Sequence, residues 1–444
     1  MPTRVHTPGS PRLPREFIQR WRGVPAGEGG PMEGLREGPV TREGPLMADG
    51  EARATRTNRA LAGALSIADL RLLARRRLPR AVFDFIDGGA GDEVTLRDNE
   101  SAFRDWLLLP RVAVDVSRRS MQTTIVGNRS ELPLMLAPTG LAGFYWPSGE
   151  LAAASAAAAA GIPFCLSTNS VASIEAVARA VPDGERWFQL YFLKDRDWMH
   201  ALVKRAKDAG YRVLCITVDL AVQGRRERDV RNAFTMPLRP RAATILDLAR
   251  RPRWLAGVLS SPPGLGNFET PDRSRFTSVA QHVASLFDPS MTWDDVARLR
   301  ELWPGPVVIK GVLHPDDARK AVEIGAQAVM LSNHGGRQLD HVPAPISALP
   351  GVVAAVGGRA EIILDGGVRR GTDILMALAL GASACSIGRP FLWGLAAAGQ
   401  EGVARAITIL RDELDNAMTL LGTAGIGDVT ATHVQARRAG PAWA

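Results

Sequence analysis

The sequence is poor in cysteine, with three residues in 444, and all three lie inside apolar, strand-like stretches. Cys165, Cys215 and Cys385 are too widely separated to form a zinc site or a disulfide framework. Scattered free thiols are typical of proteins in a reducing compartment. We therefore expect a cytoplasmic protein with neither disulfides nor a metal site.

Long apolar runs are also missing. No stretch of 18 consecutive apolar residues occurs, and the N-terminus lacks the apolar core of a signal peptide, so a transmembrane protein is excluded. Residues 1 to about 60 are instead rich in Pro, Gly, Arg and Glu without a helical or strand period. This composition predicts a disordered extension, followed by a folded domain over residues 61–444.

Lysine is scarce as well, because only five of the 54 basic residues are lysines. A net charge of +8 and a pI near 10 are typical of nucleic-acid-binding proteins. Here, however, the arginines are interleaved with acidic residues along the whole chain, and no DNA- or RNA-binding motif is present. Nucleic acid is therefore not expected as a partner.

What the sequence does contain is an alternation of apolar runs and helical patterns from residue 132 onward. Apolar strands without polar alternation are buried on both faces, as in parallel sheets covered by helices. An open doubly wound sheet is the alternative, but no G-x-G-x-x-G turn follows the first strand. The pattern predicts a closed α/β barrel of the (β/α)8 TIM type, with strands at 134–137, 162–166, 187–191, 213–218, 307–310, 328–331, 361–364 and 384–387.

Two short helices are predicted ahead of the barrel, one capped by Ser66 and ending near Arg77, the other over residues 80–86. An insertion of residues 219–292 follows the fourth strand and is far longer than a usual βα loop. Its middle, residues 250–259, is basic and then apolar. Such a segment can lie peripherally on the inner face of an anionic membrane, with Trp254 at the interface, or form a lid over the active site.

Polar residues and glycines gather where these strands end, which is the face of a barrel that carries the active site. The loops after the last two strands hold Gly366-Gly367 with Arg369, and Gly388-Arg389. Backbone N–H groups at glycine turns and helix starts, together with arginines, bind anions. Because no dinucleotide fingerprint is present, these loops predict a mononucleotide such as FMN. Lys310 ends the fifth strand and could stabilise the negative charge of a reduced flavin.

The stretch SNHGGRQLD at residues 332–340 places a histidine, two glycines and an arginine after the sixth strand. Together with DGGVRRG at 365–371, it resembles the FMN-dependent 2-hydroxy-acid dehydrogenase and oxidase family. The likeness covers residues 67–421 and is closest to the mandelate and L-lactate dehydrogenase branch, with glycolate oxidase as a further relative. The stretches RLPR at 77–80, DVSRRS at 115–120, APTG at 137–140, WFQLY at 187–191 and GRRERD at 224–229 support it. The resemblance implies FMN as cofactor and a homotetramer.

The resemblance also implies roles for individual residues. His334 would be the catalytic base, paired with Asp219, while Arg226 and Arg337 would bind the substrate carboxylate and Tyr191 would hydrogen-bond the substrate. The residues implied to hold the flavin are Pro138, Thr139, Gly140, Ser167, Gln189, Tyr191, Thr217, Lys310, Ser332, Asp365, Gly366, Gly367, Arg369, Gly388 and Arg389.

The implied reaction is oxidation of an L-2-hydroxy acid to the 2-oxo acid, with electrons passing to FMN and then to a quinone, a carrier protein or O₂. Two arginines fix a carboxylate, and a histidine beside a carboxylate accepts a proton near neutral pH. We favour hydride transfer over a carbanion route. The alternatives are an FMN barrel enzyme of another class, such as an isomerase, or a catalytically weakened flavoprotein.

One residue departs from the family pattern. Phe85 stands where the family usually has a tyrosine that contacts the substrate carboxylate. The missing hydroxyl removes a donor, which costs about 1–3 kcal/mol if no other group replaces it. It also makes the pocket more apolar and so favours a bulky or aromatic hydroxy acid over lactate or glycolate.

Overall fold

The computed structural model describes residues 59–232, 242–261, 264–268 and 287–437. The predicted N-terminal extension therefore lies outside the described residues, apart from Arg59 and Ala60, which are helical. Helix α2 (Ile67–Arg77) begins as expected at Ser66, whose side chain accepts a hydrogen bond from the backbone of Asp69. The Asp69 carboxylate accepts in return from the Ser66 backbone at 2.9 Å, which completes a capping box.

Eight parallel strands close into a barrel in the order β10-β11-β4-β5-β6-β7-β8-β9, which confirms the predicted fold class. Every strand is almost wholly buried because its inner side chains fill the barrel and its outer ones meet the helices. The strands are β4 (Leu134–Thr139), β5 (Phe164–Ser167), β6 (Arg186–Tyr191), β7 (Val213–Thr217), β8 (Val307–Val312), β9 (Ala328–Ser332), β10 (Glu361–Asp365) and β11 (Ala384–Ile387).

The start of β5 differs from the prediction. Ile162 was expected in this strand, but its backbone N–H bonds to the carbonyl of Ala157 and closes helix α5 (Gly149–Ala159). Pro163 follows and has no N–H to give to a neighbouring strand. The strand therefore begins at Phe164, which pairs with Arg186 of β6.

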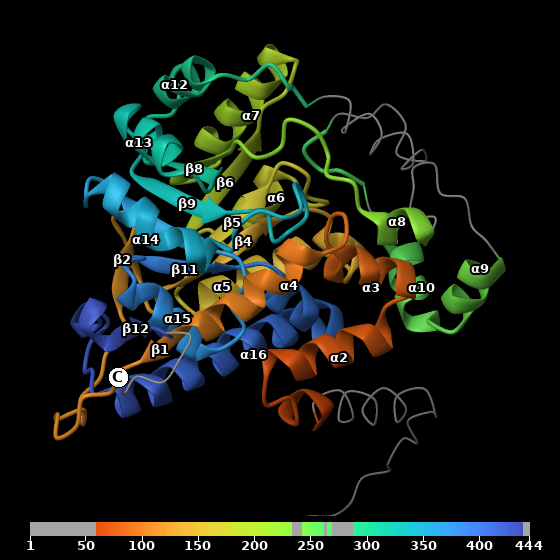
Figure 1. Cartoon of the computed structure of the whole chain (residues 1–444). Coiled ribbons are helices and arrows are strands. Elements are labelled where there is room, and N and C mark those ends of the chain that lie inside the picture. The colour runs from red at the N-terminus through yellow and green to blue at the C-terminus, as the bar shows by residue number, and fades with distance from the viewer. Residues whose placement is uncertain (1–58, 233–241, 262–263, 269–286, 438–444) are drawn as a thin grey trace, which may run out of the picture. The chain divides into compact units, whose positions relative to one another are not determined.

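Helices surround the barrel strands (Figure 1). They include α5, α6 (Ile174–Ala180), α7 (Arg196–Asp208), α12 (Trp293–Glu301), α13 (Pro315–Glu323), α14 (Pro345–Val356) and α15 (Gly371–Ala379). After the last strand the sequence pattern predicts a helix over residues 391–400 only, whereas α16 (Arg389–Leu421) is much longer and is kinked at Ala398 and Gly399. It continues beyond the kink because its apolar side chains pack against α2.

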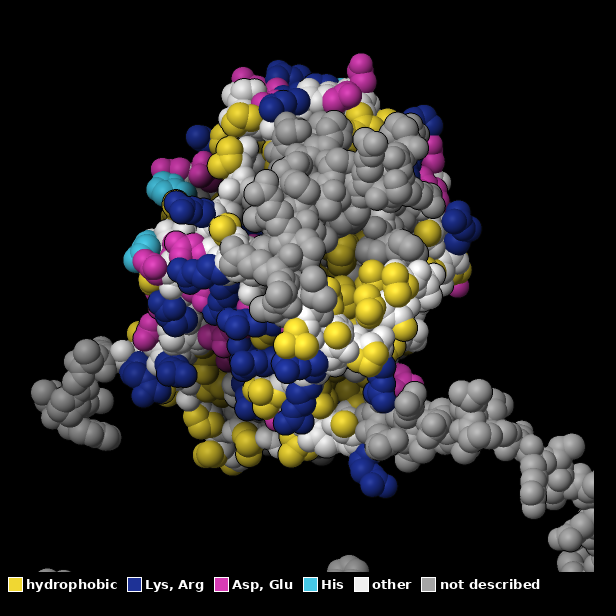
Figure 2. Space-filling model, turned by 90° about the vertical axis from the view of Figure 1, so that its right-hand side faces the viewer, with side chains coloured by type: hydrophobic (Ala, Val, Ile, Leu, Met, Phe, Trp, Pro, Cys, Tyr) yellow, Lys and Arg dark blue, Asp and Glu magenta, His cyan; other side chains and the backbone are white. Residues whose placement is uncertain are grey.

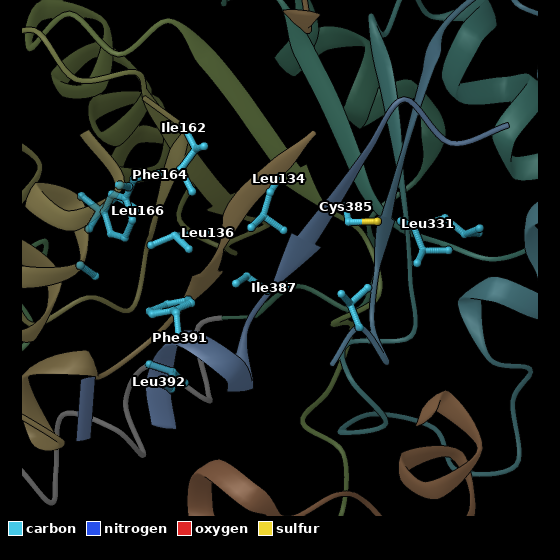
Figure 3. Close-up of a cluster of buried hydrophobic side chains, with 14 of the residues drawn as sticks. Leu134, Leu136, Ile162, Phe164, Leu166, Leu331, Cys385, Ile387, Phe391 and Leu392 are labelled. Carbon is cyan, nitrogen blue, oxygen red and sulfur yellow. The ribbon is translucent and has the colours of Figure 1, made fainter. Parts of the chain in front are cut away.

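The core has two parts, one on each side of the strands. Inside the barrel, Met135, Cys165, Trp187 and Cys215 belong to a cluster that also includes Ile125, from the hairpin of β2 (Thr123–Ile125) and β3 (Asn128–Ser130). Outside it, side chains such as Leu134, Leu136, Ile387 and Phe391 pack between strands and helices (Figure 3). The inner cluster fills the barrel, so a ligand must bind at its end and not along its axis.

Three segments distant in sequence meet at the carboxyl ends of the strands. Helix α3 (Arg80–Asp87) contacts α8 (Glu227–Arg231) from the insertion. Arg228 joins them through ion pairs with Asp87, at 3.3 Å, and Glu93, which directly precedes α4 (Val94–Ser101). The backbone N–H of Ala90 bonds to the carbonyl of Gly336 in the loop after β9, at 2.8 Å. The N-terminal helices thereby form one wall of the site.

The insertion continues with α9 (Ala242–Ala249) and α10 (Pro252–Ser260), while residues 233–241, 262–263 and 269–286 lie outside the described residues. The expectation that Trp254 lies at a membrane interface is wrong. Its indole packs against the core, and the indole N–H donates a hydrogen bond to the Phe144 carbonyl at 2.8 Å. The side chain is therefore used to hold α10 on the barrel. The exposed apolar side chains here are Leu246 and Leu259.

Candidate active site

A cavity of about 530 Å³ lies at the carboxyl ends of the strands, a size typical of cofactor and substrate sites. Most predicted site residues line it: Phe85, Pro138, Thr139, Gly140, Tyr191, Arg226, Lys310, His334, Arg337, Asp365, Gly366, Gly367, Arg369, Gly388 and Arg389. The other predicted residues do not line the cavity: Ser167, Gln189, Thr217, Asp219 and Ser332. These five are polar, and each bonds to a residue that lines the cavity or to another of the five.

His334 and Asp219 form the predicted pair. The His334 Nδ1 lies 3.0 Å from Asp219 Oδ1, and the His334 backbone N–H donates to Ser332 Oγ, also at 3.0 Å. A carboxylate can only accept, so Nδ1 carries the hydrogen and Nε2 is left as the acceptor on the cavity side. The backbone of His334 is left-handed, with φ of 56°, in the loop after β9, and the residue lines the cavity.

Arg226 and Arg337 come from different loops and meet in the cavity. Arg226 Nε donates to the Arg337 carbonyl at 3.4 Å, while Arg337 Nη1 donates to the carbonyls of Phe85 and Gly88 at 2.6 and 3.1 Å. Within the described residues, both terminal nitrogens of Arg226 and Nη2 of Arg337 have no hydrogen-bond partner. Burial, together with the charge of Arg337, lowers the pKa of Arg226 to about 9. The pair is thus a double cation in the cavity wall that an anion would stabilise.

Close approach of the two loops depends on Gly224. A Cβ at this position would lie 2.3 Å from the Arg337 carbonyl oxygen, so no other residue fits without moving the backbone. The backbone N–H of Gly224 also donates a hydrogen bond to Gln338 Oε1 at 3.2 Å, which holds this loop against the loop after β9. This glycine therefore helps to set the separation of the two arginines.

Two aromatic rings flank the arginines and the histidine. The Phe85 ring centroid lies 5.0 Å from the Arg337 guanidinium carbon and 5.9 Å from that of Arg226, so Phe85 faces the cavity as the resemblance implied. The Tyr191 ring stacks on His334 with centroids 6.5 Å apart. Burial raises the pKa of Tyr191, so its hydroxyl stays protonated and can donate.

Lys310 is buried and held by two partners, Ser332 Oγ at 2.8 Å and Asp365 Oδ2 at 2.5 Å. Ser332 Oγ in turn donates to Asp365 Oδ2 at 2.7 Å. Burial alone would lower the pKa of Lys310, but the charges of Asp365 and Asp219 and the hydrogen bond to Asp365 together outweigh it, and the pKa is raised. Lys310 is therefore a fixed cation in the cavity wall, at the position expected for stabilising negative charge on a flavin.

A neutral network adjoins this ion pair. Gln189 Oε1 accepts from Ser167 Oγ at 3.1 Å, and Gln189 Nε2 donates to Thr217 Oγ1 at 2.9 Å. These bonds fix which way the amide of Gln189 faces. In this arrangement the three side chains position one another from strands β5, β6 and β7.

The two predicted phosphate loops lie side by side, since β10 and β11 are neighbours. Gly366 and Gly367 have φ of 135° and 82°, and a Cβ on Gly367 would lie 1.9 Å from the Asn99 carbonyl oxygen. Only glycine gives this backbone, whose N–H groups can then face an anion. The start of α16 after Gly388 adds the positive end of a long helix.

The sequence suggested that the Arg389 side chain binds the anion, but its guanidinium is hydrogen-bonded to backbone carbonyls of the protein. Its three nitrogens donate to the carbonyls of Ile86, Gly335 and Gly88 at 2.8–3.0 Å. Burial, followed by the charges of Arg337 and Arg369, lowers the pKa of Arg389 to about 9. Its guanidinium thus tethers α3 to the β9 loop, and the backbone N–H at the start of α16 is what Arg389 offers to an anion.

These features fit a bound FMN. Arg226 and Arg337 line the cavity with unused guanidinium N–H groups, which suits a carboxylate, while the glycine loops after β10 and β11 suit a phosphate. Two buried polar atoms, Asn169 Oδ1 and Ser386 Oγ, have no partner in the protein, and both residues line the cavity. A ring system with hydrogen-bonding edges would satisfy such atoms.

Sequence reasoning missed several residues of the cavity. Asn169 and Ser386 lie two residues beyond Ser167 and two before Gly388, so a wider window at the strand ends would have included them. Asp229 follows Arg226 by three residues, and burial raises the pKa of its carboxyl. Tyr145 follows the short 3-10 turn η3 (Ala142–Phe144), six residues beyond β4, and no motif marks it.

Comparison with known proteins agrees with this geometry. The family model described as FMN-dependent dehydrogenase matches residues 74–436. The L-lactate oxidase of Nostoc sp. is 45% identical over 374 residues, which are 83% of this chain and 98% of that protein. The (S)-mandelate dehydrogenase of Pseudomonas putida is 42% identical over 371 residues, 83% of this chain and 93% of that protein.

Among solved structures, the crystal structure of the monotopic membrane protein (S)-mandelate dehydrogenase superposes with a TM-score of 0.82. Its sequence is 41% identical, and the match covers 84% of this chain and all of that one. The range matched by the family model, residues 74–436, contains both arginine loops, the histidine loop and both glycine loops. The chain therefore belongs to the FMN-dependent dehydrogenase family, and it is an oxidoreductase with FMN as its cofactor.

Proposed function

We propose that the protein oxidises an L-2-hydroxy acid to the corresponding 2-oxo acid. The observation that carries this proposal is the meeting of two under-bonded arginines, Arg226 and Arg337, with the His334–Asp219 pair in one cavity. Oxidation of a 2-hydroxy acid requires a cationic site that binds its carboxylate and a base that accepts its hydroxyl proton. An isomerase would have no use for the paired arginines.

The roles follow from the geometry. Arg226 and Arg337 bind and orient the carboxylate with charge-assisted hydrogen bonds, which fixes the neighbouring carbon. His334 Nε2 accepts the proton of the substrate hydroxyl, and Asp219 stabilises the imidazolium that results. Tyr191 donates to the substrate, and its ring is held by Phe287, which packs edge-on to it with ring centroids 5.2 Å apart. Bound FMN supplies the two-electron acceptor.

The wall around the substrate position supports a bulky or aromatic side chain. Phe85, Leu220, Val230, Leu265 and Phe287 all line the cavity. An apolar substituent that covers these side chains gains about 25 cal/mol per Å² of buried surface. We therefore propose mandelate-like acids as better substrates than lactate.

The test is anaerobic mixing of the FMN-loaded protein with a panel of L- and D-2-hydroxy acids, followed by absorbance of the flavin. We expect an L-acid to bleach the flavin, with kcat/KM for (S)-mandelate above that for L-lactate when a dye accepts the electrons. Repeating the assay under oxygen alone separates a dehydrogenase from an oxidase. A flavin that stays oxidised with every acid contradicts the proposal and favours a catalytically weakened flavoprotein.

We also propose that the α9–α10 region attaches the protein to an anionic membrane, where a quinone could accept electrons. No helix in the described part of the chain is long and apolar enough to cross a bilayer. On the face that carries α8, α9 and α10, basic side chains gather next to hydrophobic ones (Figure 2). Leu246 and Leu259 are 54% and 71% exposed there, beside the exposed Arg250 and Arg253. Such a surface suits anionic headgroups.

Replacing both Leu246 and Leu259 with glutamate should weaken binding to anionic vesicles by about tenfold or more, because two apolar insertions are lost and two negative charges are gained. Sedimentation with vesicles of mixed anionic and neutral lipid measures the effect. Leu302→Glu, at an exposed leucine that ends α12 elsewhere on the barrel, is the matched control. Equal sedimentation of all three proteins would show that this face does not bind membranes.

A further inference from the structure

Tyr145 is a buried phenol in the candidate active site with no role assigned so far. It lies directly after η3, where its backbone N–H bonds to the Ala142 carbonyl at 3.0 Å. Its side chain is 2% exposed and lines the same cavity as Arg226, Arg337 and His334. The turn thus delivers a hydroxyl-bearing ring into the substrate region from the loop after the first barrel strand.

Burial, nearby arginine charges and the lack of a hydrogen-bond partner make the Tyr145 hydroxyl a candidate donor to a bound anion. Burial raises the pKa of Tyr145, and the charge of Arg337 is the largest effect that lowers it. The charges of Glu150 and Asp229 raise this pKa, and the charge of Arg226 lowers it more weakly. The phenol therefore lies within the field of both arginines. Within the described residues its hydroxyl has no hydrogen-bond partner, which is a costly state for a buried polar group unless a ligand supplies one.

The other tyrosines show what is special about this one. The chain has three tyrosines. Tyr211 is structural, because its hydroxyl donates to the Ile174 carbonyl at 3.0 Å. Tyr191 stacks on His334 and so lies on the proton-transfer side of the cavity. Both cavity tyrosines lie in the field of Arg226 and Arg337, but the strongest charge effect on Tyr145 comes from Arg337, whereas that on Tyr191 comes from Asp219. Phe85, which also faces Arg337, offers a ring without a hydroxyl.

We propose that Tyr145 donates a third hydrogen bond to the substrate carboxylate, beside Arg226 and Arg337, and so replaces the donor that Phe85 lacks. This inference rests on the proposed oxidation of a 2-hydroxy acid. The carboxylate is common to all such acids, so the contribution of Tyr145 is the same for small and bulky substrates. The side chain at position 85 is then free to serve as an apolar contact.

The test is equilibrium binding of two 2-oxo acids, pyruvate and benzoylformate, to the FMN-loaded protein, followed by the change in flavin absorbance. Tyr145→Phe removes one hydrogen bond to a charged group, so we expect Kd for both acids to rise by about tenfold and by the same factor. Tyr211→Phe is the matched control and should leave both Kd values unchanged. Adding Phe85→Tyr to Tyr145→Phe should recover part of the lost affinity.

Several outcomes would overturn the inference. Unchanged binding in Tyr145→Phe, with flavin content equal to wild type, would show that the phenol does not contact the carboxylate. Loss of affinity for one acid alone would show that it contacts the substituent instead. A wild-type protein that binds both acids but is reduced by no 2-hydroxy acid would contradict the proposed function and not the carboxylate contact. Binding of neither acid by wild type would overturn both.

Discussion

Replacing His334 by alanine is expected to slow reduction of the bound flavin by substrate by about 10²–10⁴-fold, the usual contribution of a positioned general base. The hydroxyl proton then has no acceptor, because Asp219 touches Nδ1 and not the substrate side of the ring. FMN should stay bound, since the phosphate loops and Lys310 do not contact the imidazole. Stopped-flow absorbance under anaerobic conditions measures the reduction rate.

Two further variants make the result specific. His334→Asn tolerates the left-handed backbone of this residue better than alanine and should be equally slow, which separates loss of the base from backbone strain. His200→Ala, at an exposed position on helix α7, is the control and should react at the wild-type rate. Near wild-type reduction in both His334 variants would remove this residue from the base role.

Replacing Lys310 by methionine is expected to cost about 3–5 kcal/mol of folding free energy, because it leaves Asp365 charged and buried without its partner. Bound FMN should also be lost more readily, since the cavity loses its fixed cation. Urea unfolding of the flavin-free protein and retention of flavin on gel filtration measure the two effects. Lys310→Met combined with Asp365→Asn should recover much of the stability, while Lys320→Met on the surface of α13 should change neither.

The dependence of this loss on pH has a definite sign. In the wild type, burial tends to raise the pKa of Asp365, but the charge and hydrogen bond of Lys310, with smaller contributions from serine hydroxyls, outweigh it and the pKa is lowered. The carboxylate therefore contributes stability above its unfolded pKa, and that contribution is lost as the pH falls through its folded pKa. Without Lys310, burial is opposed only by the weaker serine hydrogen bonds, so the pKa of Asp365 rises. The stability deficit of Lys310→Met should then shrink as the pH is lowered from 8 to 5, and a constant deficit would contradict this account.

Much of the fold could be predicted because apolar runs and strand ends are local signals. The eight strands were found within about two residues of their observed bounds, and the capping of α2 by Ser66 was predicted from a pattern of four residues. The errors arose where distant contacts overrule local sequence. The length of α16 depends on packing against α2, and the placement of Trp254 depends on a carbonyl 110 residues earlier in the chain.

The sequence by itself determined the barrel and the family and predicted the residues of the candidate site, because these follow from strand periodicity and from motifs such as SNHGGRQLD at 332–340. The tertiary structure alone decided which side chains face the cavity and which stand behind it. The guanidinium of Arg389 donates hydrogen bonds to three backbone carbonyls. Tyr145 lines the cavity from a turn that carries no recognisable sequence motif. The reason is that hydrogen-bond partners and burial are set by residues brought together across hundreds of positions, and no local pattern records them.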